Sequence, residues 1–322
     1  MSSKIKVLQV IPKLGYGGAE IGCFDLAHFL YENNCKSYII TSGGPLLKYI
    51  DKKKVTLIRL PVQSKNPLLI LLNSIILSVL IIFLNINIVH ARSRAPAWSS
   101  LLATKITRTK FVTTFHGSYN FSSSLKKFYN SVMLRSDLII AGSNFIFSHI
   151  NQNYSKYLSH NKKFLVIYRG INTEYYNPKK IKETDEQKLI SKWNIDKNKK
   201  IILLPGRLTA WKGHEIFLEA LNQLKKQKPE IEFTAIILGS DQGRNIYKKK
   251  LERLVDQFRL SNDVKFFDNF DIMPIAYKIS DLIISSSIEP ESFGRISVEA
   301  QSMEKPIIAS NIGGSTETIE NE

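Results

Sequence analysis

Short apolar runs rich in β-branched residues alternate with helical stretches from one end of this 322-residue chain to the other. Most of these runs are apolar without interruption, which is typical of strands buried on both faces of a parallel sheet. Their alternation with helices of about 10–15 residues indicates βαβ units with right-handed crossovers. The predicted strands occupy residues 5–11, 37–42, 55–60, 86–91, 111–117, 138–143 and 164–168 in the first half, and 200–208, 233–239, 264–269, 282–287 and 306–311 in the second.

A polar and charged stretch separates the two sets of strands. Residues 172–199 contain no apolar strand run, and 322 residues are long for a single core. We therefore predict an α/β fold with a Rossmann-like domain over residues 1–171, an interdomain segment over 172–199, and a second doubly wound parallel-sheet domain over 200–322. Because ligands bind at the carboxyl ends of such strands, we expect the site in a central cleft between the two domains.

The formal net charge of +17 indicates an anionic partner. Nucleic acid, an anionic membrane face and a phosphorylated substrate are all candidates. Nucleic-acid binders usually pair cations with exposed aromatic residues or a recognition helix, and the scattered lysines here form no such module, so we expect no nucleic acid. Two lone cysteines fit a reducing compartment, and residues 1–12 lead into a strand run without a signal-peptide pattern. We expect a cytoplasmic protein.

One apolar segment raises the question of membrane contact. From Leu68 to Leu84 only Asn73, Ser74 and Ser78 interrupt an apolar run of 17 residues. A membrane-spanning helix needs about 20 apolar residues, and this run lies between two predicted strands, where a crossover helix is expected. A buried crossover helix is the leading interpretation, a helix dipping into one leaflet is the second, and a true span is the third. The lysines at 52–54 and 65 would suit an anionic membrane surface.

Three motifs of the first half place polar groups after predicted strands. "PKLGYGGAE" puts Gly17 and Gly18 before a helix, where backbone N–H groups can approach an anion, although a plain tight turn explains them equally well. "TFHGSYN" puts His116 at a strand end, either for acid–base work or as a capping or core histidine. "HARSRAPAW" puts Arg92 and Arg94 on the same rim, to meet an anionic acceptor or to be solvated.

Two motifs of the second half combine cations with carboxylates. In "LLPGRLTAWKGHE", Arg207 and Lys212 flank the turn between a buried strand and a helix, which favours a diphosphate clamp because the cations and the helix dipole act together. In "EPESFGRISVEA", Glu291 precedes a helix start and can hold sugar hydroxyls with the free N–H groups there. Glu299 lies too far along the helix to cap it and can take the two hydroxyls of a ribose.

These motifs, in this order, resemble those of the retaining GT-B glycosyltransferases of family 4, the group 1 transferases. The resemblance covers nearly the whole chain through "GGAE", "TFHG", "RGIN", "GRLTAWKG", "EPESFGRISVEA" and "PIIASNIGG". Two glutamates separated by seven residues after a strand, with Arg and Lys one motif earlier, are a specific combination. "HARSRAPAW" and "TFHGSYN" are similar to a bacterial subgroup that assembles cell-surface polysaccharide or lipopolysaccharide.

The resemblance implies a nucleotide-sugar donor of the UDP or GDP type, a glycan or lipid-linked acceptor, and work at the inner face of the cytoplasmic membrane. Arg207 and Lys212 would hold the donor diphosphate, Glu291 the sugar and Glu299 the ribose, with no metal or other cofactor. The implied donor-binding residues are Gly17, Gly18, Arg207, Lys212, Glu291, Ser292, Phe293, Gly294 and Glu299. The implied catalytic residues are His116, Arg207, Lys212 and Glu291, with Arg92 and Arg94 on the acceptor side.

Two departures and two alternatives accompany this expectation. In relatives the chain continues past the last glycine motif, so the resemblance implies an incomplete C-terminal domain that stops at Glu322. Arg295 replaces the aliphatic residue expected after "ESFG" and would add a donor contact. The alternatives are another enzyme on the same scaffold, such as a nucleotide-sugar epimerase, and a basic peripheral-membrane binding protein without catalysis.

Overall fold

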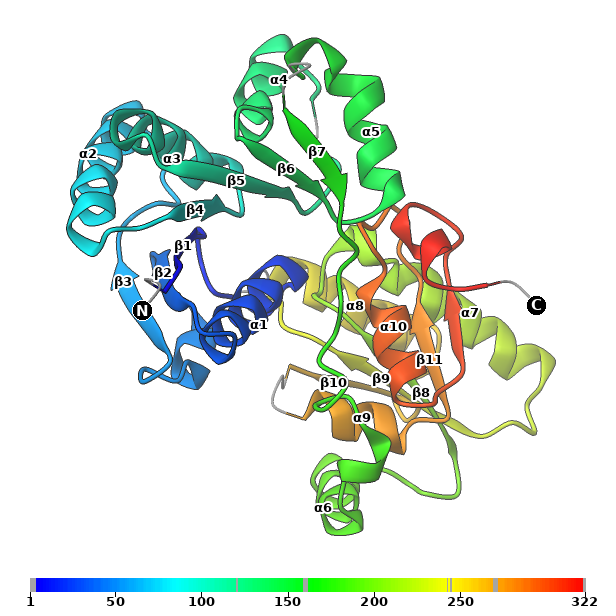
Figure 1. Ribbon diagram of the computed structural model, residues 1–322. Helices are drawn as coiled ribbons and strands as arrows, with labels where there is room; N and C mark the ends of the chain where they lie inside the picture. Colours follow the sequence, from blue (N-terminus) through cyan, green and yellow to red (C-terminus); the bar gives the residue numbers. More distant parts are fainter. Residues whose placement is uncertain are drawn as a thin grey trace. The chain divides into compact units, whose positions relative to one another are not determined.

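The computed structural model describes residues 4–119, 121–158, 162–241, 243, 245–268 and 272–320. The chain divides into two compact units, Met1–Arg169 and Gly170–Glu322 (Figure 1). Each unit is built on its own parallel sheet, seven strands in the first and five in the second. All twelve predicted apolar runs contain a strand, which confirms the α/β fold class.

The first unit has the strand order β3-β2-β1-β4-β5-β6-β7, and every neighbouring pair is parallel. The order reverses beside β1, so the crossovers before and after this point cover opposite faces of the sheet. The strands are β1 (Lys6–Val10), β2 (Lys36–Thr41), β3 (Val55–Arg59), β4 (Ile88–Ala91), β5 (Lys110–Phe115), β6 (Leu138–Ala141) and β7 (Lys163–Val166).

Helices cover both faces of this sheet. Helix α1 (Gly18–Glu32) packs on β1, β2 and β3, while α2 (Pro67–Leu84), α3 (Arg94–Thr107) and α5 (Asn144–Tyr154) share a core with β4, β5 and β6 on the other face. The short helix α4 (Ser124–Asn130) continues into a 3₁₀ turn at Ser131–Leu134, whose side chains enter the same core. Polar backbone groups of the strands are thereby removed from water on both sides.

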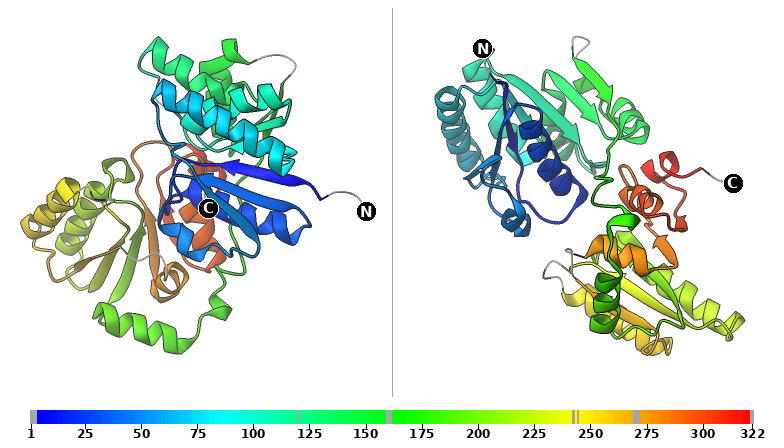
Figure 2. Two further views of the ribbon diagram at one scale, coloured as in Figure 1. Left: turned by 90° about the vertical axis from the view of Figure 1, so that its left-hand side faces the viewer. Right: turned by 60° about the horizontal axis from the view of Figure 1, so that its bottom comes forward.

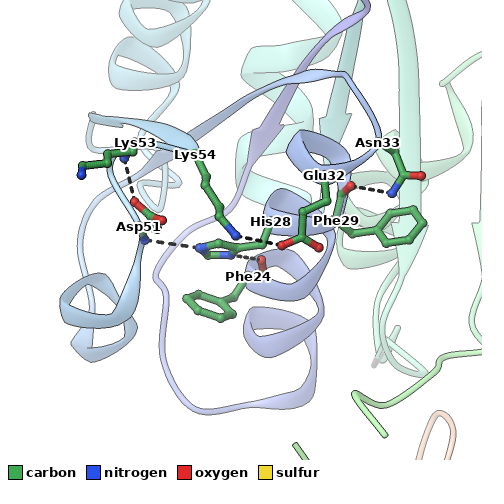
Figure 3. Close-up of polar contacts among 8 residues, drawn as sticks. All are labelled: Phe24, His28, Phe29, Glu32, Asn33, Asp51, Lys53 and Lys54. Carbon is green, nitrogen blue, oxygen red and sulfur yellow. Dashed lines mark hydrogen bonds and ion pairs between the residues drawn. The ribbon is translucent and has the colours of Figure 1, made fainter. Parts of the chain in front are cut away.

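The C-terminal half of α1 is tied to the loop before β3 (Figure 3). His28 Nδ1 donates to the carbonyl of Phe24 at 2.9 Å, so its Nε2 accepts from the Asp51 N–H at 3.3 Å. Lys54, the residue before β3, forms an ion pair with Glu32 at 2.9 Å. These bonds fix α1 against the β3 side of the sheet and place its N-terminus by the carboxyl ends of the strands.

Residues 68–84 form the predicted crossover helix, α2, but the prediction that this helix is buried is wrong. The helix lies beside α3 (Figures 1 and 2). Its outward face is nevertheless exposed, whereas Asn73, Ser74 and Ser78 point inward and are buried. Among the described residues, Pro67–Leu84 is also the helix that is long and apolar enough to cross a membrane.

The second unit has the strand order β10-β9-β8-β11-β12, again parallel throughout. Alternate residues of the central strand serve two cores: Ile201 and Leu203 face one, and Ile202 and Leu204 face the other. The strands are β8 (Lys200–Pro205), β9 (Phe233–Leu238), β10 (Val264–Phe267), β11 (Leu282–Ser285) and β12 (Ile307–Ala309). The helices are α6 (Glu183–Trp193), α7 (His214–Gln227), α8 (Asn245–Gln257), α9 (Met273–Ile279) and α10 (Arg295–Ser302).

Residues 172–199, predicted as an interdomain segment, fall within the second compact unit. Helix α6 buries Leu189 and Trp193 in the core that it shares with α9 and α10, and the Trp193 ring stacks on Phe267 at 4.2 Å. The segment is polar because one side of the helix is solvated, with Leu189 and Trp193 spaced i, i+4 on the other side.

Candidate functional site

The turn that carries Lys212 is held against the end of the neighbouring strand. After β8, a 3₁₀ turn at Ala210–Lys212 leads into α7 through Gly213. Gly213 has φ 72°, and a side chain there would collide with the carbonyl oxygen of Ser286, which directly follows β11. Only glycine combines this left-handed conformation with so close a backbone approach.

Lys212 and Glu291 form an ion pair at the carboxyl ends of β8 and β11. Nζ of Lys212 lies 2.6 Å from Oε1 of Glu291, and each side chain is only 11% exposed. Ser287 donates to the same oxygen at 2.6 Å, and the Trp211 ring centre lies 4.5 Å from the ammonium. The structure thus brings together two residues 79 positions apart that sequence motifs marked separately.

Arg207 adds to the positive potential at this pair. Burial by itself would raise the pKa of Glu291, but the charge of Lys212, its hydrogen bond and that of Ser287, and the charge of Arg207 together lower the pKa below its ordinary value. Glu291 is therefore a carboxylate at neutral pH. An ammonium carries three N–H donors, so Lys212 can meet a second anion without releasing Glu291.

Glu299 belongs to a second, separate charge pair on α10. Gly294, with φ 81°, caps the helix start, and Glu299 lies one turn and a half further along, 5% exposed. Its Oε1 accepts from Arg295 Nε at 2.6 Å, and its Oε2 accepts from the Tyr277 hydroxyl at 2.9 Å. Arg295, expected to add a donor contact, pairs with Glu299 in this structure, and the donor contact stays a prediction.

The backbone around Glu291 is clamped by the segment that follows β12. The carbonyl of Glu291 accepts from the Gly314 N–H at 2.7 Å, and Glu291 forms an isolated parallel bridge with Gly313. Ser292, Phe293 and Gly294 follow directly, so the turn predicted to hold a sugar is positioned from both strands β11 and β12. Within the described residues, no three His, Cys, Asp or Glu side chains gather closely enough to hold a metal ion.

In the first unit, Arg92 and His116 follow neighbouring strands. Arg92 is 7% exposed and donates from Nη1 to Gln9 at 2.9 Å, while its Nε is buried without a hydrogen-bond partner among the described residues. Both ring nitrogens of His116 are likewise buried and unpartnered within that part of the chain. Burial, followed by the charges of Arg169 and Arg92, lowers the pKa of His116 well below its usual range, so the ring is neutral at pH 7.

Arg169, which follows β7 within "RGIN", was not among the predicted site residues. Its guanidinium donates to the carbonyl of Gly18, the first residue of α1. A methyl group at Gly22 would lie 2.6 Å from Arg169 Nη2 and 3.2 Å from Arg92 Nη2. Gly22 therefore leaves a space on α1 that both guanidinium groups enter. The sequence signal that could have marked Arg169 as a site residue was a lone arginine after a predicted strand.

The other predicted residues of the first unit have different surroundings. Gly17 is the N-cap of α1, and the carboxylate of Glu20 lies over it. Arg94 donates to Asn130 at 3.0 Å, and its guanidinium stands 4.3 Å from the ring centre of Tyr119. Arg94 thereby ties α3 to α4 and to the turn after β5, in contrast to Arg92 on the same motif.

Two family profiles match the chain on either side of the division between the units. The profile described as Glycosyltransferase Family 4 matches residues 16–175, and that described as Glycosyl transferases group 1 matches residues 185–322. Among curated proteins, spore coat protein SA of Bacillus subtilis is 28% identical over 242 residues, which are 73% of this chain and 62% of that protein. The match thus spans less than two thirds of this relative's length.

Solved structures extend the similarity over both units. A glycosyltransferase from Rickettsia africae is 42% identical, with a TM-score of 0.85 over 99% of this chain and 82% of that one. HepE of Anabaena, solved with UDP and glucose, is 24% identical, with a TM-score of 0.81 over 98% of this chain and 83% of that one, which supports the fold. The chain belongs to the group 1 glycosyltransferases, family 4, with the GT-B fold.

Proposed function

We propose that this protein is a retaining glycosyltransferase that moves a sugar from a nucleotide-sugar donor to a glycan or lipid-linked acceptor. The observation that carries the proposal is the buried Lys212–Glu291 pair beside Arg207 at the carboxyl ends of β8 and β11. This arrangement offers cations for a diphosphate next to a carboxylate for sugar hydroxyls. HepE, of the same fold, was crystallised with UDP-glucose, which favours a UDP-type donor here.

The chemical contribution of the donor site is electrostatic. As the bond between the sugar and the phosphate breaks, negative charge grows on the departing phosphate and the sugar becomes oxocarbenium-like. Lys212 and Arg207 would stabilise that charge from fixed positions, and such preorganised stabilisation commonly contributes most to an enzyme's rate enhancement. Glu291 and the backbone of residues 292–294 would orient the sugar. The acceptor hydroxyl would attack from the leaving-group side, its proton passing to the phosphate, without an enzymic nucleophile or metal.

Glu299 would bind the ribose hydroxyls while remaining paired. Its carboxylate accepts hydrogen bonds from Arg295 and Tyr277 and also interacts with the Tyr176 hydroxyl, and a carboxylate offers about four acceptor positions in all. Burial and the charge of Glu299 raise the pKa of Tyr277 well above its usual range, so the hydroxyl stays a donor. In this proposal Arg295 and Tyr277 fix the direction in which Glu299 presents its free lone pairs.

The acceptor would be met by the first unit. Arg92 and Arg169 converge over Gly22 next to the start of α1, and neutral His116 lies within their field. Two guanidinium groups at one place favour an anionic group such as a phosphate on the acceptor. Arg94, engaged by Asn130 and Tyr119, serves the fold. The role in lipopolysaccharide or other cell-surface polysaccharide synthesis rests on the motif resemblance.

Isothermal titration calorimetry with UDP and GDP tests the donor site. We expect one of the two to bind, and Lys212→Ala to weaken that binding about 10- to 100-fold, the value of one or two lost charge-assisted bonds. Lys225→Ala is the matched control, because Lys225 pairs with Asp263 elsewhere in the second unit. Unchanged affinity in Lys212→Ala would refute the assignment.

The alternative of an epimerase is separated by products. Incubation of the bound nucleotide-sugar without acceptor should return the same sugar, apart from slow hydrolysis. An epimerised sugar would favour another enzyme of this fold, and nucleotide binding without turnover of any acceptor would favour a binding protein.

A further inference from the structure

The outward face of α2 is a continuous apolar stripe. Its exposed residues recur at spacings of three and four and lie on one side of the helix, from Leu68, 76% exposed, to Phe83, 80% exposed. We call this set the α2 stripe, and its members are Leu68, Leu71, Leu72, Ile75, Val79, Ile82 and Phe83. The adjacent helix α3 exposes Leu102 and Ile106 as well. A surface helix of a globular protein normally turns such a face inward.

The opposite face of α2 explains why the apolar stripe faces outward. Ser74 and Ser78 are buried, and each hydroxyl donates to the carbonyl four residues earlier, at 2.6 Å and 2.8 Å. Their small side chains let α2 approach α3, which offers Ala97, Ser100 and other small buried residues. Leu77 and Ile81 enter the core of the first unit. This face is part of the core of the first unit. Helix α2 therefore lies on the surface of the unit and could cross a bilayer only if that core were disrupted.

The part of the chain that contains the stripe is rich in positive charge. Between Asp51 and Asp137 the chain contains no acidic residue, but it contains Lys52, Lys53, Lys54, Arg59, Lys65, Arg92, Arg94, Lys105, Arg108, Lys110, Lys126, Lys127 and Arg135. Exposed cations lie toward both ends of the stripe: Lys65 precedes the start of α2, and Lys105 and Arg108 are at the end of α3, at the edge where α2 also ends.

The amino edge of the sheet adds a row of lysines. In the parallel sheet of the first unit, β1, β2, β5 and β7 all begin with lysine, so Lys6, Lys36, Lys110 and Lys163 share one edge. Helices α2 and α3 end at this edge, because each runs from the carboxyl end of one strand to the start of the next. Lys6 Nζ donates to the last α2 carbonyl, that of Leu84, at 2.7 Å, which places one of these lysines directly at the stripe.

We propose that the α2 stripe inserts into the surface of an anionic lipid bilayer, with the flanking cations on the headgroups. An apolar helix face bordered by lysine and arginine has the chemistry of an interfacial helix. A second copy of the chain is a poorer occupant, because a symmetric dimer through this face would oppose two cationic surfaces. Insertion would involve the first unit alone and does not depend on the proposed transfer reaction.

Vesicle co-sedimentation of the full chain tests the stripe. We expect binding to phosphatidylcholine vesicles that contain phosphatidylglycerol to exceed binding to pure phosphatidylcholine at least about tenfold. Ile75→Glu/Val79→Glu, at the centre of the stripe, should lower binding at least about tenfold. Leu125→Glu is the matched control, since Leu125 is 81% exposed on α4 of the same unit, and it should bind like the unchanged chain. Circular-dichroism melts establish that each variant folds.

Two further measurements separate insertion from its rivals. A polarity-sensitive fluorophore is attached to the cysteine of Val79→Cys in a Cys35→Ser background, and its emission should shift to the blue when anionic vesicles are added. Lys105→Gln/Lys110→Gln should lower vesicle binding about fivefold for each of the two lysines that contacts the membrane surface. Unchanged vesicle binding by Ile75→Glu/Val79→Glu would overturn the proposal. So would a dimer in sedimentation velocity that this double substitution converts to a monomer, because the stripe would then hold a second copy.

Discussion

The two units carry similar residues at their strand ends but arrange the charges differently. In the second unit each buried cation described at the site has its own carboxylate: Lys212 has Glu291, and Arg295 has Glu299. In the first unit, Arg92 and Arg169 meet over Gly22, and Arg92 Nε and the His116 ring nitrogens lack partners among the described residues. In the second unit the cations pair directly with carboxylates, whereas Arg92 donates to the neutral amide of Gln9 and the charges of Asp25 and Glu20 act on it from nearby.

Under the proposed function, this difference corresponds to two kinds of ligand binding. A site of satisfied pairs is rigid and keeps its geometry without ligand, which suits a group that must be oriented for reaction. Arg92 Nε lacks a hydrogen-bond partner among the described residues, so Arg92 has a donor left for an anion at a place that the Arg169 guanidinium also enters. Under the proposed function, the second unit would orient the donor and the first would bind an anionic group of the acceptor.

The largest effect is expected from breaking the neutral pair. Glu291→Ala leaves the Lys212 ammonium buried without its carboxylate, which should lower the free energy of unfolding of the second unit by about 3–5 kcal/mol. Lys212→Met/Glu291→Leu removes both charges and should recover most of that loss. Urea denaturation measures both, with 5-fluorotryptophan NMR separating Trp98 in the first unit from Trp193 and Trp211 in the second.

The exposed pair Lys248–Glu252 provides the control for this experiment. Its side chains are 41% and 48% exposed, so Glu252→Ala should change stability little. A Glu291→Ala loss no larger than that of Glu252→Ala would mean that Lys212 is solvated and that the two units do not differ in this way.

An intermediate effect is expected from acid. His214, at the start of α7, is fully buried, and burial lowers its pKa to about 4. Since the unfolded histidine titrates near 6.5, the unfolded state binds more protons between these values, and stability falls as the pH falls through this window. The second unit should lose about 2 kcal/mol between pH 6.5 and pH 5. His214→Gln should abolish this loss.

The first unit should respond to acid in the same direction. Burial lowers the pKa of His90 and His116 well below the usual range. His116→Gln should therefore reduce the pH dependence reported by Trp98 without altering that of the second unit. If His214→Gln changed the Trp98 response instead, the two units would not unfold independently, and the comparison would have to be drawn for the whole chain.

The smallest effect is expected where the two guanidinium groups meet over Gly22. Arg92→Met removes a desolvated charge but also the donor to Gln9, so we expect a loss of about 1 kcal/mol from the first unit. Inorganic phosphate should raise the unfolding midpoint of the unchanged chain, compared with chloride at the same ionic strength, and this gain should shrink in Arg92→Met. Arg94→Met is the control and should keep it. Equal phosphate gains in Arg92→Met and the unchanged chain would leave the first unit without an anion site.

Much of the fold could be predicted because its signals are local. The uninterrupted apolar runs before "GRLTAWKG" and "EPESFGRISVEA" marked β8 and β11, and the motifs themselves marked the turns into the following helices. Since parallel strands present their carboxyl ends at one edge, Lys212 and Glu291 could be expected together. The contact of Arg169 with Gly18 could not be predicted, because the two residues lie 151 positions apart in different elements, nor could the pairing of Arg295 with Glu299.

By itself, the amino-acid sequence determined the alternation of strands and helices and the positions of the turns, because backbone preference and apolar periodicity act over a few neighbouring residues. Only the tertiary structure decided which charges neutralise one another and which face of α2 is buried. An almost wholly apolar helix gives no directional pattern, so the close approach of Ser74 and Ser78 to α3 selects the inward face and leaves leucine, isoleucine and phenylalanine outside.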